Sequence, residues 1–422
     1  MRVNLVFIII DTFIFANIFF EMIKSFNSFT GQGFVVRLIF FLAYSGQSVF
    51  LTFYNLYLKD NGFSTRQIGI IASMLNIIMV IILPLWGMIA DRLGRKRMLM
   101  FVLFTSGLLL WLFRINGGMA WFISVTLLFA LFNNPLASFV DNLALDYSEY
   151  SGIPLYGQIR VWASIGWAVA VVLAGLFIST YGIKYIIHLG CFILLLTFLV
   201  TVTGYKVPER RDTSGVRFLD FRKLISQAGM PFFLIVIFIQ GIFSAPLYLF
   251  INLYYDEIGA DYDMLGIAIA VQSMSELPFF FFGDRIVKRF GPKKVLIVAM
   301  LAAVIRMFLY GITGSPVLAI IVGVLHGLCL GLFIIATISY IQALTPSRLR
   351  ATGQSLMYAT YFGAGFTLGN LFIGFISELI MMKGVMLVNS AAILILSMIV
   401  LLKLPPVKRL NKYTPTVSQG SF

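Results

Sequence analysis

Two short basic turns, each between long apolar segments, constrain this chain more than any other feature of its sequence. The first is GMIADRLGRKR at residues 87–97, and a degenerate echo, FGDRIVKRFGPKK, occupies residues 282–294. Several cations between two apolar stretches indicate a chain that leaves a membrane and re-enters it at once. Because the turn recurs in the second half, the sequence predicts two related halves with this loop on the same side of the membrane.

The composition also places the chain in a membrane. Of its 422 residues, 60% are hydrophobic and 11% are charged, and the mean hydropathy is +0.96. A water-soluble protein needs a polar surface that this composition cannot supply. The net charge of +14 does not indicate a nucleic-acid partner, because the Lys and Arg residues lie in short loops between apolar runs. Two cysteines and two histidines, far apart in sequence, predict neither a disulfide framework nor a metal site.

Apolar runs of about 20 residues, the length that crosses a bilayer, recur along the chain and predict an all-α membrane protein of about twelve transmembrane helices. We expect spans at residues 35–58, 67–90, 98–114, 119–143, 157–180, 184–204, 230–254, 263–283, 295–313, 316–344, 352–380 and 384–403. The expected organisation is an N-terminal six-helix bundle at 35–204, a linker at 205–229, a C-terminal six-helix bundle at 230–404 and a polar tail at 405–422.

The charges of the loops predict the orientation. Of the 31 Lys and Arg residues, 21 lie in loops of one side, and five lie in loops of the other: Lys59, Arg66, Arg114, Lys184 and Lys383. The positive-inside rule therefore places the linker and the C-terminus in the cytoplasm, in a multi-pass protein of the plasma (inner) membrane. Residues 1–34 are apolar but carry two acidic residues, and an extra helix, a signal segment and a misplaced start codon all stay open.

The first basic turn resembles the loop motif of the major facilitator superfamily, written G-x-x-x-D-R-x-G-R-K. The matching residues are Gly87, Asp91, Arg92, Gly94, Arg95 and Lys96. They fall between the second and third expected spans, where that family carries the motif, and the resemblance covers about residues 35–404. It implies two pseudo-symmetric six-helix bundles and solute transport by alternating access.

Other segments resemble the lactose permease and phenylpropionate permease branch of that family. Residues 134–147 and 156–168 are similar to its fourth and fifth helices, and QSMSELPFF, VIRMFLYG and LHGLCLGLF to its eighth, ninth and tenth. That branch imports sugars and related solutes with protons. The resemblance implies a polar core of Asp141, Arg160, Glu276, Arg306 and His326. The chain departs from the lactose permease pattern at Cys329, where that permease has a proton-carrying glutamate, and it lacks that permease's seventh-helix aspartates.

Charged side chains inside membrane spans cost about 2.5 to 3.5 kcal/mol at a helix centre, so they face a partner or water. Glu276, in the middle of the eighth span, either binds a substrate hydroxyl or a proton, or is a permanently paired structural carboxyl. We expect Arg160 to line a cavity with Trp162 nearby, since aromatic faces stack on guanidinium groups and on sugars. Asp141, at the end of the fourth span, either lines the same cavity or forms a salt bridge with Arg160.

Neutral polar residues form a further pattern. Arg306 and His326 lie within the ninth and tenth spans, and His326 is a candidate proton or substrate contact, or it is simply hydrogen-bonded to a neighbour. In the seventh span a stripe with a spacing of four consists of Gln240, Ser244, Tyr248 and Asn252. Such a stripe faces a cavity or another helix rather than lipid. A scattered polar set in the first span includes Gln47, and interhelical hydrogen bonding is the alternative explanation for both sets.

We do not expect the first basic turn to bind solute. Asp91 near a helix terminus, with the arginines beside it, is expected to latch the ends of the two halves together and so to bias a conformational equilibrium. Aligning Gly291 with Gly94 puts Lys288 at the position of Asp91, so such a latch would be asymmetric.

The sequence carries neither the phosphate-binding G-x-x-x-x-G-K-[ST] motif nor a nucleophile elbow, so we expect no enzyme and no ATP-driven pump. We expect a monomeric secondary transporter in contact with lipid that imports a small polar or aromatic solute, a saccharide first. A proton gradient would drive it, with sodium not excluded and with no other cofactor. Two alternatives stay open: an exporter of amphipathic drugs, and a non-transporting receptor on the same fold.

Overall fold

The structure is a computed structural model that describes residues 31–152, 156–208, 224–227, 229–345 and 350–406. Most of the expected N-terminal extension, most of the linker and the tail beyond residue 406 therefore lie outside the described residues. The side chains of Asp91 and Arg92 also lie outside them.

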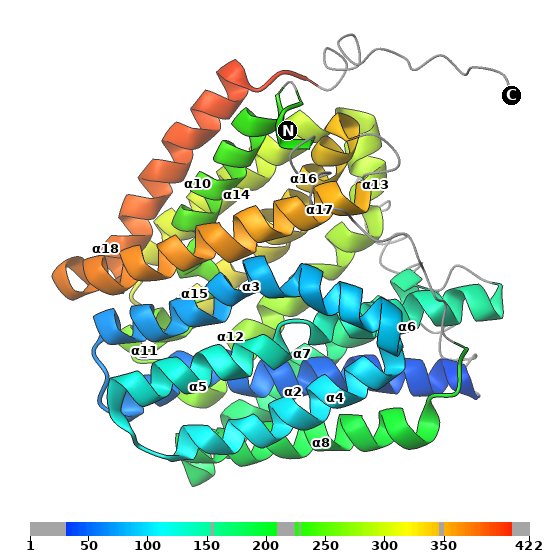
Figure 1. Cartoon of the computed structure of the whole chain (residues 1–422). Helices are drawn as coiled ribbons and strands as arrows, with labels where there is room; N and C mark the ends of the chain where they lie inside the picture. The colour runs from blue at the N-terminus through cyan, green and yellow to red at the C-terminus, as the bar shows by residue number, and fades with distance from the viewer. Residues whose placement is uncertain (1–30, 153–155, 209–223, 228, 346–349, 407–422) are drawn as a thin grey trace, which may run out of the picture.

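Residues 31–208 form the N-terminal half, which is helical (Figure 1). Its elements are α2 (Gln32–Asp60), α3 (Thr65–Leu93), α4 (Arg95–Leu109), the 3₁₀ turn η1 (Leu110–Arg114), α5 (Gly118–Asn133), α6 (Leu136–Ser151), α7 (Tyr156–Tyr181), the 3₁₀ turn η2 (Ile183–Tyr185) and α8 (Ile186–Gly204). Ser64 and Gln67 form a capping box that starts α3, which satisfies two backbone groups at the helix end.

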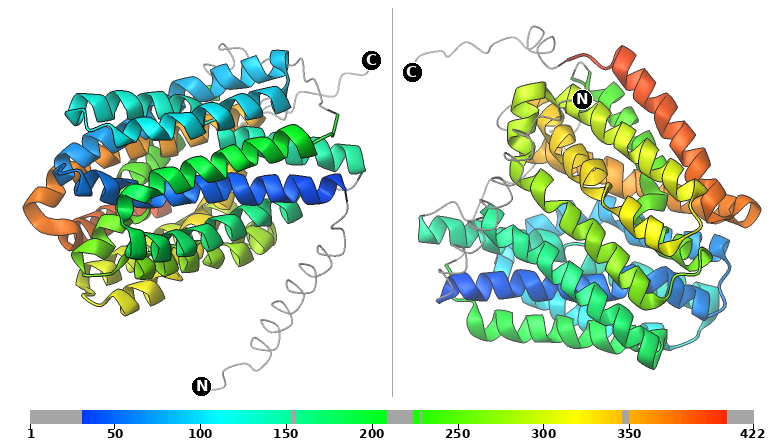
Figure 2. Two further views of the ribbon diagram at one scale, coloured as in Figure 1. Left: turned by 90° about the horizontal axis from the view of Figure 1, so that it is seen from below. Right: turned by 180° about the vertical axis from the view of Figure 1, so that it is seen from behind.

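The C-terminal half, from residue 229 on, is also helical. It contains α10 (Met230–Tyr248), α11 (Ile251–Glu257), α12 (Tyr262–Ser275), α13 (Leu277–Phe290), α14 (Pro292–Ile312), α15 (Pro316–Gly323), the π-helical turn η3 (Gly327–Gly331), α16 (Leu332–Leu344), α17 (Arg350–Tyr358), the π-helical turn η5 (Ala359–Gly365) and α18 (Phe366–Lys403). Figure 2 shows the sharp bend where the orange part of α18 meets the red part, and the non-helical residue there is Met381 (φ 58°, ψ 167°).

The expected membrane spans are confirmed as helices. Nine of the described helices are long and apolar enough to cross a membrane. The remaining expected spans correspond to α3, to the pair α12 and α13, and to the part of α18 after its bend. The chain is thus an all-α protein with the expected succession of spans.

Three expected spans are broken near a proline where the sequence pattern predicted one continuous helix. The fourth is broken beside Pro135, and α6 then runs to Ser151, so Asp141 lies inside a helix and not at the end of one. The seventh is divided between α10 and α11, shortly after Pro246. The eighth is divided at Glu276 because Pro278 cannot donate the backbone hydrogen bond that would continue α12. Near these prolines the helix is therefore interrupted, and a second helix then continues the same span.

The two basic turns have the same backbone geometry. Gly94 (φ 99°, ψ 133°) ends α3 and starts α4, and Gly291 (φ 82°, ψ 148°) ends α13 and starts α14. In both turns the glycine N–H donates to the carbonyl three residues before the last helical residue, that of Ala90 or Val287. Positive φ favours glycine, because a Cβ is disfavoured there. We call the end of the molecule that carries these turns the basic end, and the opposite end the Lys59 end.

The two halves pack directly on each other through α7 against α12 and α3 against α18. Glycines allow backbone to approach backbone at both crossings. A Cβ on Gly175 would lie 2.4 Å from the Tyr262 carbonyl oxygen, and one on Gly69 would lie 2.6 Å from the Asn370 carbonyl oxygen. These crossings are therefore where one half meets the other.

Candidate functional site

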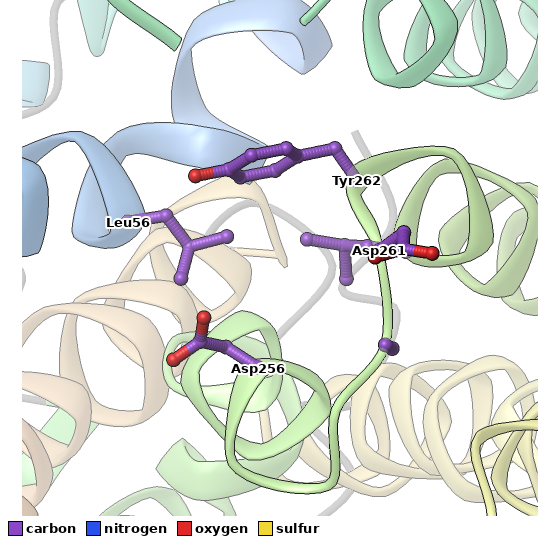
Figure 3. Close-up of a pocket in the computed structure, with 6 residues that line it drawn as sticks. Leu56, Asp256, Asp261 and Tyr262 are labelled. Atoms are coloured by element: carbon purple, nitrogen blue, oxygen red, sulfur yellow. The ribbon is translucent and has the colours of Figure 1, made fainter. Parts of the chain in front are cut away.

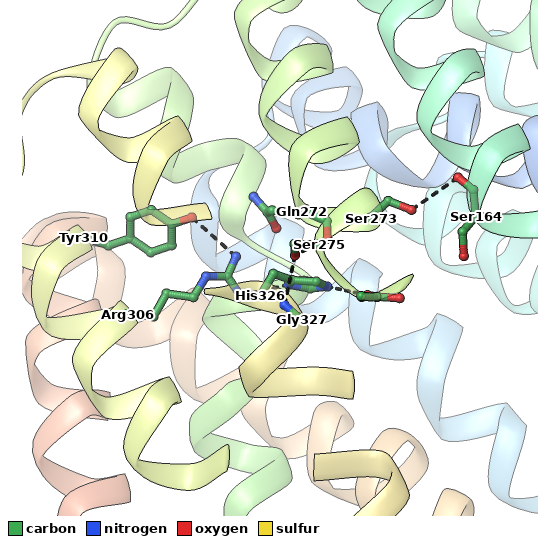
Figure 4. Close-up of polar contacts among 9 residues, drawn as sticks. Ser164, Gln272, Ser273, Ser275, Arg306, Tyr310, His326 and Gly327 are labelled. Atoms are coloured by element: carbon green, nitrogen blue, oxygen red, sulfur yellow. Dashed lines mark hydrogen bonds and ion pairs between the residues drawn. The ribbon is translucent and has the colours of Figure 1, made fainter. Parts of the chain in front are cut away.

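A chain of three charged or titratable side chains links three spans of the C-terminal half. Arg306 Nη1 donates to His326 Nδ1 at 2.8 Å, and His326 Nε2 lies 2.6 Å from Glu276 Oε1 (Figure 4). Arg306 Nη2 also donates to the Tyr310 hydroxyl at 3.3 Å. Because Arg306 can only donate, His326 Nδ1 accepts and Nε2 carries the proton that is shared with the carboxylate. We call Glu276, His326 and Arg306 the charge chain.

Irregular backbone positions two members of the charge chain. Glu276 occupies the junction of α12 and α13, and not the middle of a regular helix as the sequence suggested. His326 immediately precedes the π-helical turn η3, whose first N–H, that of Gly327, donates to Ser275 Oγ at 2.9 Å. Irregular helical geometry at membrane depth is tolerated where neighbouring groups satisfy the freed backbone atoms. Here the serine before Glu276 does so, which ties the two segments together.

Gly327→Ala is expected to destabilise the protein by about 1 to 3 kcal/mol, the usual cost of overpacking. A Cβ at this position would lie 1.9 Å from the Ser275 carbonyl oxygen, which is backbone and cannot turn aside. Thermal unfolding in detergent measures the effect. Gly314→Ala is the matched control, because its Cβ would meet only Lys383 Nζ, at 3.6 Å. Equal unfolding midpoints for the two variants would contradict this account of the η3 contact.

Burial decreases along the charge chain toward the other half. Arg306 is fully buried, whereas the side chains of His326 and Glu276 are 9% and 14% exposed. One turn before Glu276, Ser273 Oγ donates to the Ser164 carbonyl oxygen of α7 at 3.4 Å (Figure 4). Glu276 is therefore the member of the chain that lies at the interface between the halves, and Arg306 is the member enclosed by its own half.

Part of the seventh-span stripe lies beside the charge chain. The Tyr248 ring is edge-on to the His326 ring, 5.4 Å away, and Gln240 donates to Ser244 within α10 at 2.9 Å. Asn252 does not continue this stripe, because it lies in α11, after the break that follows α10, and donates to the Thr52 carbonyl oxygen of the other half at 2.8 Å. The prediction of one four-residue stripe was therefore wrong in its last member.

Arg160 lies in a second polar cluster, in the N-terminal half. Arg160 Nε is 3.8 Å from Asp141 Oδ1, and both side chains are about one-third exposed. The guanidinium lies over the Tyr44 ring, 4.7 Å from its centroid. Trp162 packs against the hydrophobic core, while Tyr358 of the other half lies within electrostatic range of both Arg160 and Asp141. The pair thus forms a salt bridge and also faces the C-terminal half.

The first-span residue Gln47 is nearly buried in α2, at 8% exposed. Asn55, a further polar residue of the same helix, donates to the Leu249 carbonyl oxygen at 2.6 Å. This bond spans the two halves at the break between α10 and α11. A polar residue of the first span thus forms a hydrogen bond between the two halves, a contact that hydropathy alone did not predict.

Four hydrogen bonds and ion pairs between described residues join the halves at the Lys59 end, and we call them the clasp. They are the ion pair of Lys59 with Asp256, the bonds of Asn55 and Asn252 to carbonyls of the opposite half, and the Arg66 N–H donated to Glu378 at 3.2 Å. Beside the ion pair, Leu56, Asp256, Asp261 and Tyr262 line a cavity of about 170 Å³ (Figure 3). Sites for drug-sized molecules usually measure about 300 to 1,000 Å³, so this cavity is too small to be the solute site.

Lys59→Gln is expected to change the free energy of unfolding by less than about 1 kcal/mol, because exposed ion pairs contribute little. The two side chains are 56% and 35% exposed. Loss of the ion pair is nevertheless expected to open the clasp more often. A cysteine placed at Leu56 should then react faster with a polar maleimide in the variant than in the chain that keeps Lys59. Lys383→Gln, which removes a cation at the same end, is the control. A loss of stability far above this limit, or unchanged labelling, would contradict the clasp.

Two contacts of the first basic turn join elements of the N-terminal half. Arg95 Nη1 donates to Asp146 Oδ1 of α6 at 2.8 Å, and Lys96 Nζ donates to the Tyr205 carbonyl oxygen at 2.6 Å. For these two residues the observed role is to hold α4 against α6 and the end of α8. The latch predicted at Asp91 and Arg92 falls on side chains outside the described ones.

Sequence reasoning missed two partners in these clusters. Tyr310 lies four residues after Arg306 in α14, a spacing that places both on one helix face, so this contact had a local signal. The Lys59 and Asp256 pair joins residues 197 positions apart and had none.

Comparison with known proteins agrees with this architecture. A sequence model described as the MFS_1 like family matches residues 34–388. The uncharacterized transporter YwbF of Bacillus subtilis is 28% identical over 340 residues, 80% of this chain and 83% of that protein. The maltose permease of Geobacillus stearothermophilus is 26% identical over 348 residues, 82% and 87%. A probable 3-phenylpropionic acid transporter of Escherichia coli is 24% identical over 349 residues, 80% and 89%.

A crystal structure of the nucleoside transporter NupG has the same fold, with a TM-score of 0.78 at 18% identity over 90% of this chain and 99% of that one. The family match covers both halves, including the two basic turns and all three residues of the charge chain. The chain therefore belongs to the MFS_1 like family of the major facilitator superfamily, and it is an integral multi-pass membrane protein that transports a solute and is not an enzyme.

Proposed function

We propose that the chain is a monomeric secondary transporter that couples the import of a small polar or aromatic solute, a saccharide first, to the inward movement of protons. The observation that carries this proposal is the charge chain. A carboxylate at the interface between the halves accepts from a histidine whose other ring nitrogen accepts from a buried arginine. Carboxylate and imidazole are the groups that exchange protons under physiological conditions.

The position of Glu276 provides a route from protonation to movement. When Glu276 binds a proton, it loses the charge that makes its bond with His326 strong. This change occurs at the junction of α12 and α13, one turn from the Ser273 contact with α7. A charge change at a contact between two rigid parts alters the relative free energies of their two arrangements, and that is the requirement for coupling. Sodium stays the alternative coupling ion.

The proposed solute class rests on the polar groups that face the interface. Arg160 and Tyr44 offer a guanidinium on an aromatic face, and Glu276 offers a hydrogen-bond acceptor for hydroxyl groups. Relatives include a maltose permease, a probable 3-phenylpropionic acid transporter and a putative nucleoside transporter. These names favour hydroxylated and aromatic solutes as the first compounds to test.

We further propose that the basic end faces the cytoplasm of a plasma membrane, because its turns carry most of the loop cations. The clasp then closes the external side. An arrangement closed outside corresponds to the inward-facing state of alternating access.

The test uses right-side-out and everted vesicles of a host that lacks its own sugar permeases. Labelled saccharides, nucleosides and 3-phenylpropionate are supplied with and without an imposed pH gradient. We expect accumulation of one class above its outside concentration in right-side-out vesicles with an acidic exterior. Uptake that only equilibrates contradicts proton coupling, and gradient-driven loss of an amphipathic compound identifies an exporter instead.

A further inference from the structure

Two cations of the N-terminal half lie at the Lys59 end without an acidic partner. Arg114 ends the turn η1 and Lys184 lies in the turn η2, and both side chains are exposed. Among the described residues neither forms an ion pair, whereas Lys59 at the same end pairs with Asp256. This end of the molecule has few cations, so two neighbouring ones with uncompensated charge need an explanation.

The two cations belong to one cluster. Arg114 Nη1 donates to His188 Nε2 at 2.7 Å, which orients the guanidinium against the first turn of α8. The His188 ring is edge-on to Trp111, 4.7 Å away, and lies 5.5 Å from the Tyr185 ring. Lys184 Nζ is 5.5 Å from the same Tyr185 ring. We call Trp111, Arg114, Lys184, Tyr185 and His188 the headgroup cluster.

The headgroup cluster presents hydrogen-bond donors but no carboxylate. Arg114 has five N–H donors and uses one on His188, and the ammonium of Lys184 has three. The start of α8 adds the positive end of its helix dipole, although its first N–H, that of Ile186, already donates to the Ile183 carbonyl oxygen. The ligand that complements this set is an anion with several acceptor oxygens, such as a phosphate group.

The surroundings of the headgroup cluster are those of a membrane–water interface. It joins the end of the third span, α4 with η1, to the start of the sixth, α8, and these two helices lie side by side along the lower edge of the molecule in Figure 1. The nearby aromatic side chains face outward: Trp111 is 45% exposed, Tyr181 61% and Phe192 64%. Trp and Tyr are enriched at this level of a bilayer, where the rings contact both acyl chains and headgroups.

We infer that the headgroup cluster binds the phosphodiester headgroup of an anionic phospholipid. Arg114 and Lys184 hold the phosphate beside the positive end of α8, and the exposed aromatic side chains contact the upper acyl chain. A free phosphate would use the same donors, but it would leave that aromatic surface uncovered. The site is separate from the charge chain and belongs to neither the solute path nor the clasp.

The test measures which lipid lies next to Trp111. The full chain is reconstituted in phosphatidylcholine vesicles that contain equal mole fractions of either brominated phosphatidylglycerol or brominated phosphatidylcholine. Bromine quenches a tryptophan that it contacts, and subtraction of the Trp111→Phe variant isolates the signal of Trp111 from those of the other four tryptophans. We expect stronger quenching by the anionic lipid.

Lys184→Gln is expected to weaken the preference for phosphatidylglycerol about five-fold, the contribution of one cation near an anionic headgroup. Arg114→Gln should weaken it at least as much, and Lys383→Gln should leave it unchanged. Lys184 makes no hydrogen bond or ion pair to described residues, so its variant stays folded, which the unfolding midpoint in pure phosphatidylcholine checks. Equal quenching by both lipids, or a preference that survives both substitutions, overturns the inference. If adding inorganic phosphate abolishes the preference for phosphatidylglycerol, the site binds a free anion, and the inference of a phospholipid is overturned.

Discussion

Replacing Glu276 by glutamine is expected to abolish accumulation of the solute while leaving exchange at equal concentrations in place. Glutamine keeps the size of the side chain and can still bond to His326, but it cannot bind and release a proton. A pH difference of one unit supplies about 1.4 kcal/mol per proton, which supports about tenfold accumulation. The accumulation ratio should therefore fall from about ten in the wild type to one in the variant under that gradient.

The measurement is uptake of labelled solute into right-side-out vesicles, followed to the plateau with and without the pH gradient. Asp263→Asn is the matched control, because it removes a carboxylate from the first turn of the same helix, α12, far from the charge chain. Asp263→Asn should accumulate solute as the wild type does. If Glu276→Gln still accumulates solute, the proton is carried elsewhere and the proposed role of the charge chain is wrong.

Arg306→Met is expected to lower the free energy of unfolding by about 3 to 5 kcal/mol, the cost of removing one partner from a buried charged pair. Arg306 is fully buried and bonds to both His326 and Tyr310. Methionine fills part of the volume but leaves the Glu276 carboxylate without its counter-charge. Transport should be lost as well, because His326 is then held from one side only.

A double-mutant cycle separates this charge effect from lost packing. If Arg306 mainly balances the charge of the Glu276 carboxylate, Arg306→Met lowers the free energy of unfolding less when Glu276→Gln is already present. The expected coupling energy is about 1 to 3 kcal/mol, as for groups of one network. The readout is chemical unfolding in detergent for the wild type, the two single variants and the double variant. Arg66→Gln, which removes an arginine at the interface between halves whose guanidinium lies over the Phe375 ring and outside the charge chain, serves as the control. Additive costs would show that Arg306 and Glu276 do not interact through His326.

Much of the fold was predictable because the information that specifies it is local. A run of apolar residues specifies a helix that crosses a membrane, since every backbone polar group must be satisfied within such a segment. The recurrence of the basic turn was equally local, and Gly94 and Gly291 adopt the same backbone geometry in both copies. The breaks at Pro135 and Pro278 also had a local cause, although the apolar pattern concealed them.

The sequence predicted which residues form the charge chain, but it did not predict all the contacts of the candidate site residues. Family resemblance brought together Glu276, Arg306 and His326, but the single-helix stripe failed at Asn252 because α10 ends before it. The sequence also did not predict that the Tyr44 ring, from another helix, lies against the Arg160 guanidinium.

The sequence by itself thus determined that this protein is a bundle of membrane helices in two related halves, with its cations gathered in the turns of one end. Only the tertiary structure decided which polar side chains contact each other. Glu276 contacts His326, which is 50 positions away in the sequence, and Lys59 contacts Asp256, which is 197 positions away. The physical reason is that hydropathy fixes where a helix lies in the membrane. It does not fix the rotation of each helix about its axis or the crossing with its neighbours, which depend on close packing of small residues and on interhelical hydrogen bonds.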